Sequence, residues 1–379
     1  MLLYKKIKNN HCRWSIDTNK KINYDVISTC DIFSVKNDVL YKITGGGNNV
    51  ERVVIIDSHL YEQHANNIRN YFAFYSTSCK IVTIDGDEDN KNLENFVKIC
   101  KELDNLQIKR RSQPVIAIGG GVLTDVVSFA CSCYRRGIPY IRIPTTLMAY
   151  VDAVIGIKTG VNFEGNKNRI GTFSVPLAVI MDHTFFNTLP VRHISNGIGE
   201  IIKLAVIKDK VLFELLENNV TTCIKDKFLN SGDEILERAV HGMLEELEPN
   251  LFEDNLERIV DFGHTFSPII EMINANDMLH GESVAIDICL SSILAHIKGL
   301  LSEVNVKRII NLVMKSNLPV YHESITPKIM WDGLMERSLH RDGLQRVPLP
   351  VQIGEAIFSN DIKLSEIEDT LSYLKNMKH

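Results

Sequence analysis

The sequence predicts an α/β protein in which a half built on a parallel β-sheet, residues 1–184, precedes a mostly α-helical half, residues 185–379. Two observations carry this prediction. Short apolar runs alternate with helical patterns in the first half, whereas long amphipathic helical segments with few strand signals fill the second. A chain of 379 residues also fits two domains of about 150–200 residues better than a single core.

Five apolar runs in the first half have the length and the bounding turn residues of buried strands. They are RVVIID (52–57), CKIVTID (79–85), PVIAIGGG (114–121), PYIRIPTT (139–146) and LAVIMD (177–182). Between some of them, residues 93–103 and 124–137 have helical spacing, and Gly137 closes the second segment. Because strand–helix–strand units join parallel neighbours, we expect a largely parallel sheet.

The second half contains four segments whose apolar residues recur at helical spacing. They are residues 200–219, 235–248, 264–273 and 282–301. We place the boundary between the halves near residue 184. A cleft between two such halves is a common place for a small-molecule site.

Composition and charge argue against several classes of partner. The formal net charge is −5 and no run of five like charges occurs, which disfavours a nucleic acid or an anionic membrane surface. The sequence shows no stretch of about 18 apolar residues and no signal-peptide pattern, so we expect a cytoplasmic protein without a membrane span. The eight cysteines contain no CxxC pair, which favours reduced thiols.

A glycine-rich turn marks a candidate nucleotide site. In AIGGGVLTD (117–125), three glycines lie between an expected strand and an expected helix, where a pyrophosphate can approach backbone N–H groups. Asp57, at the end of an earlier strand, is placed to accept from a ribose hydroxyl. A structural turn and a solvated strand-end carboxylate are equally good interpretations of these two features. Taken with the expected sheet, the turn favours a Rossmann-like nucleotide-binding domain for the first half.

Six further motifs occur in one order along the chain. They are GGGVLTDVVSFACSCYRRG, IPTTLMAYVDAVIGIKTGVNF, KNRIG, NGIGEIIK, DFGHTFSPIIE and LHGESVAID. With these motifs, which cover more than half of the chain, the sequence resembles the dehydroquinate synthase superfamily. The resemblance implies an NAD-binding α/β domain followed by a helical metal-binding domain.

The resemblance implies a divalent metal site on Glu200, His264 and His280. One carboxylate and two imidazoles, with coordination positions left open, suit a catalytic Zn²⁺ or Co²⁺. The spacings of 64 and 16 residues form no local metal-binding motif. On the residues alone, a structural histidine is therefore the better interpretation of each imidazole.

The same resemblance implies an NAD site and a substrate site. The implied NAD-binding residues are Asp57, Glu88, Lys91, Gly120, Gly121, Asp125, Thr145, Thr146, Asp152, Lys158, Lys167 and Thr188. Glu88 and Lys91 match loosely, and a solvated loop is the alternative there. The implied catalytic and substrate-binding residues are Arg136, Asp152, Lys158, Lys167, Asn168, Lys203 and Asp261. Arg136 matches an arginine that contacts the substrate phosphate across a subunit boundary, which implies a homodimer.

Departures from dehydroquinate synthase concern the residues that hold its substrate carboxylate. Met243 and Leu339 stand where that enzyme has lysine, Glu257 where it has arginine, Asp261 where it has asparagine, and Pro268 where it has histidine. A glutamate in place of an arginine repels a carboxylate. We therefore expect a substrate that presents hydroxyls, which Asp261 can accept from.

Within the superfamily, this pattern and the Glu282 of HGES resemble the 2-epi-5-epi-valiolone synthases, which act on sedoheptulose 7-phosphate, although Leu339 departs from their proline. The resemblance implies transient NAD-dependent oxidation, phosphate elimination, re-reduction and intramolecular aldol cyclisation. Lys158 and Lys203 would stabilise developing oxyanions, while Arg136, Lys167 and Asn168 would hold the phosphate. The alternatives are a desmethyl-4-deoxygadusol synthase, a dehydroquinate synthase, a metal-dependent polyol dehydrogenase and a non-catalytic nucleotide-binding module.

Overall fold

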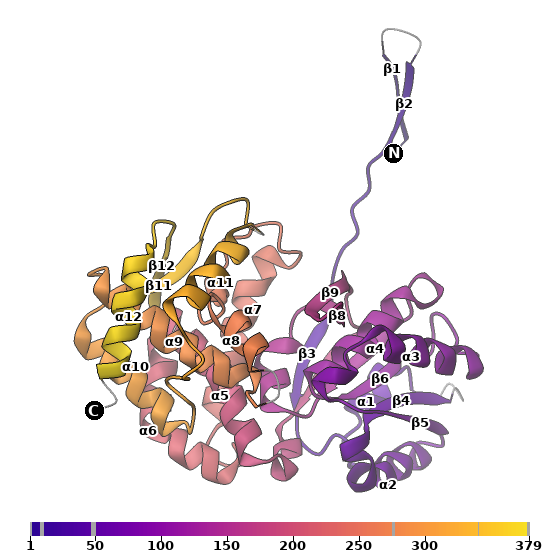
Figure 1. The fold of residues 1–379 in the computed structure, drawn as a ribbon. Helices are drawn as coiled ribbons and strands as arrows, with labels where there is room; N and C mark the ends of the chain where they lie inside the picture. Colours follow the sequence, from indigo (N-terminus) through magenta and orange to yellow (C-terminus); the bar gives the residue numbers. More distant parts are fainter. Residues whose placement is uncertain (1, 8–10, 47–50, 275–276, 340, 377–379) are drawn as a thin grey trace.

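A computed structural model describes residues 2–7, 11–46, 51–274, 277–339 and 341–376. Its centre is a six-stranded sheet in which each paired neighbour is parallel, in the order β3–β10–β7–β6–β4–β5 (Figure 1). The strands are β3 (Asp25–Thr29), β4 (Arg52–Asp57), β5 (Cys79–Ile84), β6 (Val115–Gly119), β7 (Tyr140–Pro144) and β10 (Ala178–Asp182). The five predicted strands and the parallel sheet are thus confirmed. The edge strand β3 escaped prediction because its sequence, DVIST, is short and only half-buried.

Helices cover both faces of this sheet, and the side chains of each inner strand alternate between them. On one face Val54 and Ile56 of β4 pack with α1 (Val39–Ile43) and α2 (Ser58–Phe74). On the other, Val53 and Ile55 pack with α3 (Leu93–Asn105) and α4 (Gly121–Cys133). The near-continuous apolar runs of the sequence reflect this burial on two sides. The two helices predicted in this half are confirmed, with α4 ending before Gly137.

The order of the central strands creates a switch point between β4 and β6. The chain leaves β4 into α2 on one face and leaves β6 into α4 on the other. Asp57 ends β4, and Gly120 and Gly121 follow β6. In open α/β sheets, ligands bind in the crevice outside the carboxyl ends of the strands at such a point.

Two hairpins in the first half were not predicted. The hairpin of β8 (Lys158–Phe163) and β9 (Asn166–Phe173) packs against α4. The hairpin of β1 (Leu2–Ile7) and β2 (His11–Ile16) projects away from the body on an extended segment (Figure 1). A π-helical turn, η3 (Ala149–Ala153), precedes β8. Short 3₁₀ turns are η1 (Glu88–Asn90), η2 (Tyr134–Arg136), η4 (His183–Thr188), η5 (Glu248–Asn250) and η6 (Ile259–Asp261).

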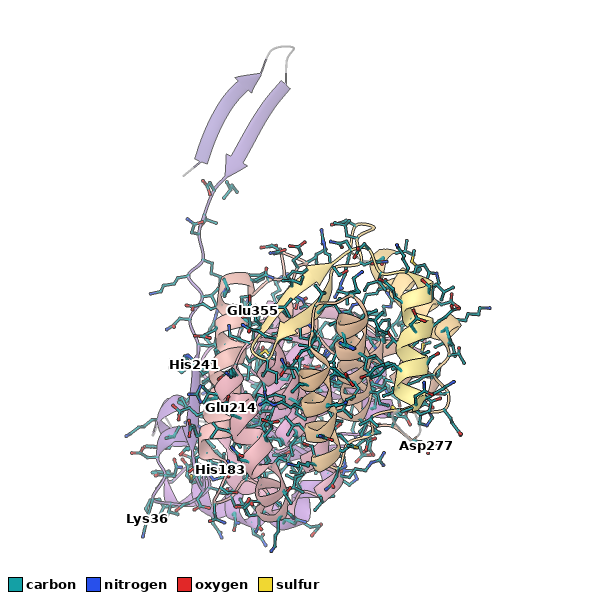
Figure 2. The ribbon with its side chains drawn as sticks, turned by 90° about the vertical axis from the view of Figure 1, so that its left-hand side faces the viewer. Lys36, His183, Glu214, His241, Asp277 and Glu355 are labelled. Carbon is teal, nitrogen blue, oxygen red and sulfur yellow. The ribbon has the colours of Figure 1, made fainter. Side chains whose placement is uncertain are left out.

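The second half is a helical bundle around α9 (His280–Ile297), whose side chains are buried along nearly its whole length. The surrounding elements are α5 (Val191–Ile207), α6 (Lys210–Asp226), α7 (Asp233–Leu247), α8 (Ser267–Ile273), α10 (Glu303–Lys315), α11 (Pro327–Leu339), β11 (Val347–Gln352), β12 (Glu355–Ser359) and α12 (Leu364–Asn376). Figure 2 views the molecule from the side of the helical half and labels three of its exposed residues: Glu214 of α6, His241 of α7 and Glu355 of β12.

Two helix predictions in this half need correction. The helix expected over 200–219 is two helices, because the chain turns at Lys208 and the Asp209 carboxylate accepts from the backbone N–H of Leu212 at 3.0 Å to start α6. The helix expected over 264–273 begins only at Ser267, which leaves His264 in the preceding turn.

The sheet ends at Asp182 and α5 begins at Val191. The largest apolar cluster nevertheless includes Val179 and Met181 of β10 with residues from α5 to α12, so the halves share packed side chains. The domain boundary near residue 184 therefore stays a prediction. Among the described residues, no helix combines the length and apolar character needed to cross a membrane.

Candidate metal and nucleotide site

Three predicted metal ligands meet at one point in the helical half. Glu200 lies on α5, His280 begins α9, and His264 lies in the turn after η6. One ligand atom from each lies within 4.8 Å of the other two. The Oε1 atom of Glu200 is 3.4 Å from Nε2 of His280 and 3.6 Å from Nε2 of His264. We call Glu200, His264 and His280 the triad.

Close contact between α5 and α9 brings two members of the triad together. A Cβ atom on Gly199 would lie 2.6 Å from the carbonyl oxygen of Gly281, and one on Gly281 would lie 1.9 Å from that of Asn196. The backbone N–H of Gly281 donates to Oδ1 of Asn196 at 2.6 Å. Only glycine permits this approach. The residues that adjoin the two glycines, Glu200 and His280, therefore face each other.

Hydrogen bonds at Nδ1 orient both imidazoles. His280 Nδ1 lies 3.0 Å from Oε2 of Glu271, and His264 Nδ1 lies 3.2 Å from the carbonyl oxygen of Phe262. A proton held on each Nδ1 leaves the Nε2 lone pair directed toward Glu200, as metal-binding histidines require. Sequence reasoning did not assign Glu271, although it ends the motif DFGHTFSPIIE. Its role becomes visible only when α8 is placed beside His280.

The donor set fits a divalent cation. Glu200 is fully buried, and its Oε1 has no hydrogen-bond donor among the described residues although two imidazole nitrogens face it. A buried carboxylate oxygen without a donor is costly and needs a partner. A cation bound by Oε1 and both Nε2 atoms removes this cost, and N/O ligation of this kind suits Zn²⁺ or Co²⁺.

The protonation states within the triad depend strongly on burial and on neighbouring charge. Burial lowers the pKa of His264. Burial alone would also lower the pKa of His280, but the carboxylates of Glu200 and Glu271 outweigh it and raise the pKa to about 10. Burial would raise the pKa of Glu200, but Lys203 and the two imidazoles hold it well below its usual value. A cation that binds the triad must therefore displace a proton from His280.

Two lysines predicted to be catalytic lie beside the triad. Lys203, only 2% exposed, contacts Oε2 of Glu200 and lies 3.5 Å from Oδ1 of Asp152. Although burial opposes it, the pKa of Lys203 is raised by Asp152 and Glu200. Lys158 contacts Glu253, which sequence reasoning missed, and desolvation together with the cation of Arg258 lowers its pKa to about 8. The two ammonium groups therefore differ in their tendency to lose a proton at neutral pH.

Asp261 is surrounded by arginines. One carboxylate oxygen contacts Arg258, and the other contacts Arg341 and lies 3.1 Å from Nη2 of Arg337. Burial would raise the pKa of Asp261, but these cations together hold it far below its usual value. None of the three arginines was predicted. The predicted hydrogen bond from a substrate hydroxyl stays a prediction, since a carboxylate offers more acceptor positions than these contacts use.

Lys167 connects the two halves of the molecule at this site. Its Nζ lies 2.6 Å from Oε1 of Glu271 on α8 and 3.5 Å from Oε1 of Glu88 on η1. Glu88 also accepts from Nδ2 of Asn162 at 2.8 Å. The backbone N–H of Asn168 donates to Oδ1 of the same Asn162 at 2.9 Å. Glu88 is thus placed next to the hairpin β8–β9 although it is an exposed residue.

The remaining predicted NAD-binding residues lie at the carboxyl ends of β4, β6 and β7. Asp57 caps α2 by accepting from the backbone N–H of His59 at 3.1 Å. Gly120 and Gly121 follow β6. Gly120 packs closely against Thr146, because a Cβ added to it would lie 3.3 Å from Cγ2 of that residue. The backbone N–H of Thr145 donates to the carbonyl oxygen of Gly119 at 3.0 Å.

One ion pair extends this edge of the sheet. The buried Lys91 lies 2.6 Å from Oδ2 of Asp125 on α4, so the loosely matched segment around Lys91 is packed rather than a free loop. The structure thus places Asp57, Gly120, Gly121, Thr145 and Thr146 at this edge of the sheet, with Lys91 paired to Asp125 of α4 beside it. Their contacts with a nucleotide stay predictions.

Arg136 lies outside this cluster, because it is exposed at the end of α4 opposite to Gly121. Thr188 ends η4, which follows the carboxyl end of β10, and its hydroxyl donates to the carbonyl oxygen of Phe185 at 3.3 Å. Among the positions that depart from dehydroquinate synthase, Met243 is buried on α7, whereas Glu257 and Leu339 are exposed. Within one chain, the structure therefore gives Arg136 no contact with the triad among the described residues.

Glu271→Gln should weaken metal binding by about 10- to 100-fold, because a neutral amide holds the Nδ1 proton of His280 less strongly than a carboxylate. The affinity for Zn²⁺ can be measured by competition with a chelator. Glu217→Gln, which removes a carboxylate paired with Arg308 on the outer helices, is the matched control and should leave the affinity unchanged. Equal affinities for all three proteins would contradict the role given to Glu271.

Comparisons with known proteins agree with this geometry. The 3-dehydroquinate synthase N-terminal family model matches residues 81–196, and the 3-dehydroquinate synthase C-terminal model matches residues 197–339. The chain is 43% identical to a 2-epi-5-epi-valiolone synthase of Streptomyces albus over 94% of this chain and 88% of that protein. It is 32% identical to a demethyl-4-deoxygadusol synthase of Trichormus variabilis over 98% of this chain and 92% of that protein.

A solved structure supports the same relationship. The 2-epi-5-epi-valiolone synthase of Streptomyces hygroscopicus, with NAD⁺ and Zn²⁺ bound, superimposes with a TM-score of 0.92 at 41% identity. The match covers 96% of this chain and all of the other. Together with the two family models, these similarities confirm the superfamily that the motifs indicated. The chain belongs to the 3-dehydroquinate synthase family.

Proposed function

We propose that this chain is a sugar phosphate cyclase that converts sedoheptulose 7-phosphate into 2-epi-5-epi-valiolone and inorganic phosphate. The observation that carries the proposal is the arrangement of the triad with Lys203 in contact with Glu200, and with Asp152 and Lys158 close to Lys203. The full-length similarity to 2-epi-5-epi-valiolone synthases supports the choice of reaction within the family.

The chemistry needs a hydride acceptor and several charged groups in one site. Bound NAD⁺ would supply a reversible hydride acceptor, and a divalent cation on the triad would supply a Lewis acid. Oxidation of carbon 5 to a ketone makes the hydrogen on carbon 6 acidic, so that phosphate leaves from carbon 7 by elimination. After the hydride returns to carbon 5, the ring opens and the enol at carbon 7 attacks the carbon 2 ketone. No net oxidation results.

The lysines of the site have different tasks. Because its pKa is raised, Lys203 remains an ammonium at neutral pH and stabilises oxyanion charge. With a pKa lowered to about 8, Lys158 can both stabilise charge and exchange a proton in this pH range.

The phosphate of the substrate is held by Lys167, Asn168 and Arg136. Arg136 holds it from a second subunit, which explains its exposed position and makes the enzyme a homodimer, as proposed from the resemblance.

The environment of Asp261 supports a substrate without a carboxylate. The guanidinium groups of Arg258, Arg337 and Arg341 already face a carboxylate of the chain itself. A carboxylated substrate would have to compete with that internal anion for the same cations. Among the family's reactions, this favours the heptulose phosphate over the substrate of dehydroquinate synthase. The location we propose is the cytoplasm, as expected from the sequence.

The test is inorganic phosphate release from sedoheptulose 7-phosphate with NAD⁺ and Zn²⁺ or Co²⁺, beside the dehydroquinate synthase substrate. We expect phosphate from the heptulose alone, no accumulation of NADH, and NMR signals of 2-epi-5-epi-valiolone. NADH formed in proportion to product would indicate a polyol dehydrogenase. A different cyclitol would indicate a desmethyl-4-deoxygadusol synthase, and activity with the carboxylated substrate alone would refute the argument from Asp261.

A further inference from the structure

Arg142 is a fully buried cation that the proposed reaction does not use. It lies on β7, on the face of the sheet covered by α4, with no exposed surface. Among the described residues, no carboxylate lies within ion-pair distance of it. Its guanidinium is instead held by neutral groups: Nε donates to Oγ of Ser128 on α4 at 2.9 Å, and Cζ lies 5.5 Å from the ring centre of Tyr140.

The other guanidinium nitrogens bind one short segment of backbone. Nη1 donates to the carbonyl oxygen of Val154 at 3.2 Å and to that of Gly156 at 2.7 Å, and Nη2 donates to that of Lys158 at 2.8 Å. A buried charge is costly unless its hydrogen bonds are made. The desolvation of Arg142 is therefore offset by contacts with alternate residues of the segment 154–158.

The intervening carbonyls of this segment are also bound. The hydroxyl of Tyr24 donates to the carbonyl oxygen of Ile155 at 2.7 Å, and the backbone N–H of Ser174 donates to that of Ile157 at 2.8 Å. Five consecutive carbonyls thus each accept a hydrogen bond, although residues 154–157 belong to no helix or strand. Buried carbonyls outside helices and strands need partners from elsewhere in the chain, and here three of the five bonds come from one side chain.

The fixed segment connects two residues of the proposed site. Asp152, 3.5 Å from Lys203, lies just before it in the π-helical turn η3, and Lys158 ends it at the start of β8. The side chain of Lys158 points to Glu253 and feels the charges of Asp152 and Lys203. The position of the Lys158 ammonium therefore depends on the path of the backbone from 154 to 158.

We infer that Arg142 is a positioning residue, whose guanidinium holds the 154–158 backbone so that Asp152 and Lys158 face Lys203 and the triad. This inference rests on the proposed function for the roles of those side chains. A planar group with donors on three nitrogens reaches Ser128 and three carbonyls at once, whereas the single ammonium of a lysine does not. Arg142→Lys therefore retains the charge but loses most of the geometry.

The experiment compares wild-type holoenzyme with Arg142→Lys by amide hydrogen exchange and by kinetics. We expect faster exchange in peptides that cover residues 151–160 and little change elsewhere. We also expect kcat to fall by about tenfold or more, while KM, the Zn²⁺ content and NAD⁺ affinity change by less than about threefold, because misplaced groups act on the transition state. Lower thermal stability with native kcat, or native exchange in 151–160, would overturn the inference.

A second buried arginine of the same sheet provides the matched control. Arg52 on β4 is 1% exposed and donates through Nη2 to the carbonyl oxygen of Gly46 at 2.8 Å, at the end of its strand opposite to Asp57. Arg52→Lys should lower the melting temperature without changing kcat. An equal loss of kcat in both variants would show a general effect of burying lysine and would count against Arg142.

Should Arg142→Lys fail to fold, Ser128→Ala decides the question. It removes the hydroxyl that accepts from Nε of Arg142. We expect faster exchange in 151–160 and a kcat lowered severalfold, and native values of both would overturn the inference. If the wild-type protein turned over none of the family's substrates, the proposed function would be refuted instead. The exchange data would still show whether Arg142 holds the backbone of residues 154–158.

Discussion

Glu200→Gln is expected to empty the metal site and to lower kcat/KM for sedoheptulose 7-phosphate by about 10³-fold or more. The substitution keeps the volume of the side chain but removes the negative charge that faces both Nε2 atoms of the triad. With two imidazoles and a neutral amide, the site binds Zn²⁺ or Co²⁺ much more weakly. Metal content after dialysis and phosphate release measure the two effects.

A surface glutamate on the next helix controls for the loss of charge. Glu214 lies on α6 and is exposed (Figure 2), so Glu214→Gln should retain full metal content and turnover. Wild-type enzyme should also gain thermal stability with added Zn²⁺, because a cation that binds only the folded state shifts the unfolding equilibrium. Glu200→Gln should lack that gain. Full occupancy and turnover in the variant would show that the cation binds elsewhere.

The sheet was predictable from the sequence because its strands are buried on two faces. Runs such as RVVIID leave little choice other than an inner strand, and their ends place Asp57 and Gly120 at one edge. The hairpin β8–β9 was also within reach of sequence reasoning. Glu164 and Gly165 form the turn between β8 and β9, and both have positive φ. A glycine in a two-residue turn between two short extended segments is a common hairpin signal.

The helix break at Asp209 illustrates a limit of periodicity. The apolar pattern of residues 200–219 is interrupted by the charged run at 208–210, and the capping geometry of Asp209 starts a new helix there. An acidic residue inside a helical pattern therefore gives a signal for a new N-terminus, but an ambiguous one. The packing of α5 and α6 on each other decides it.

The triad could not have been predicted from spacing, since its members come from three separate elements. The resemblance supplied Glu200, His264 and His280, and the structure then showed why they meet, through the contact of Gly199 with Gly281. Supporting groups such as Glu271 were not predicted. Such a group contacts a metal ligand that is distant in the sequence, as Glu271 contacts His280. Nothing in its local sequence distinguishes it from a surface charge.

Lys203→Met is expected to lower kcat by about 10²- to 10³-fold while the protein remains able to bind its cation. Lys203 is 2% exposed and provides the ammonium beside both Glu200 and Asp152. Its removal takes this buried ammonium away from both carboxylates, which should destabilise the fold by ~3–5 kcal/mol in the metal-free protein. Phosphate release and unfolding in denaturant, each with and without Zn²⁺, separate the two effects.

The pH dependence of this loss of stability has a defined sign. The pKa of Lys203 is raised by folding, so its contribution is fully present below the unfolded pKa of about 10.4 and is lost as the pH rises through the folded value. The contribution of the Lys203 ammonium itself should therefore stay constant between about pH 6 and about pH 9.

Lys208 offers the matched control for this experiment. It comes directly after α5, the helix that carries Lys203, and it forms ion pairs away from the triad. Its Nζ lies 3.3 Å from Glu245 and also contacts Glu246. Lys208→Met should cost little stability and leave kcat unchanged, since a partly exposed ion pair contributes about 0–1 kcal/mol. Lys203→Met with near-native turnover would remove Lys203 from the reaction. The metal ion would then be enough to balance the charge of Glu200 and Asp152. Lys158 would be the cation that remains to stabilise the oxyanion.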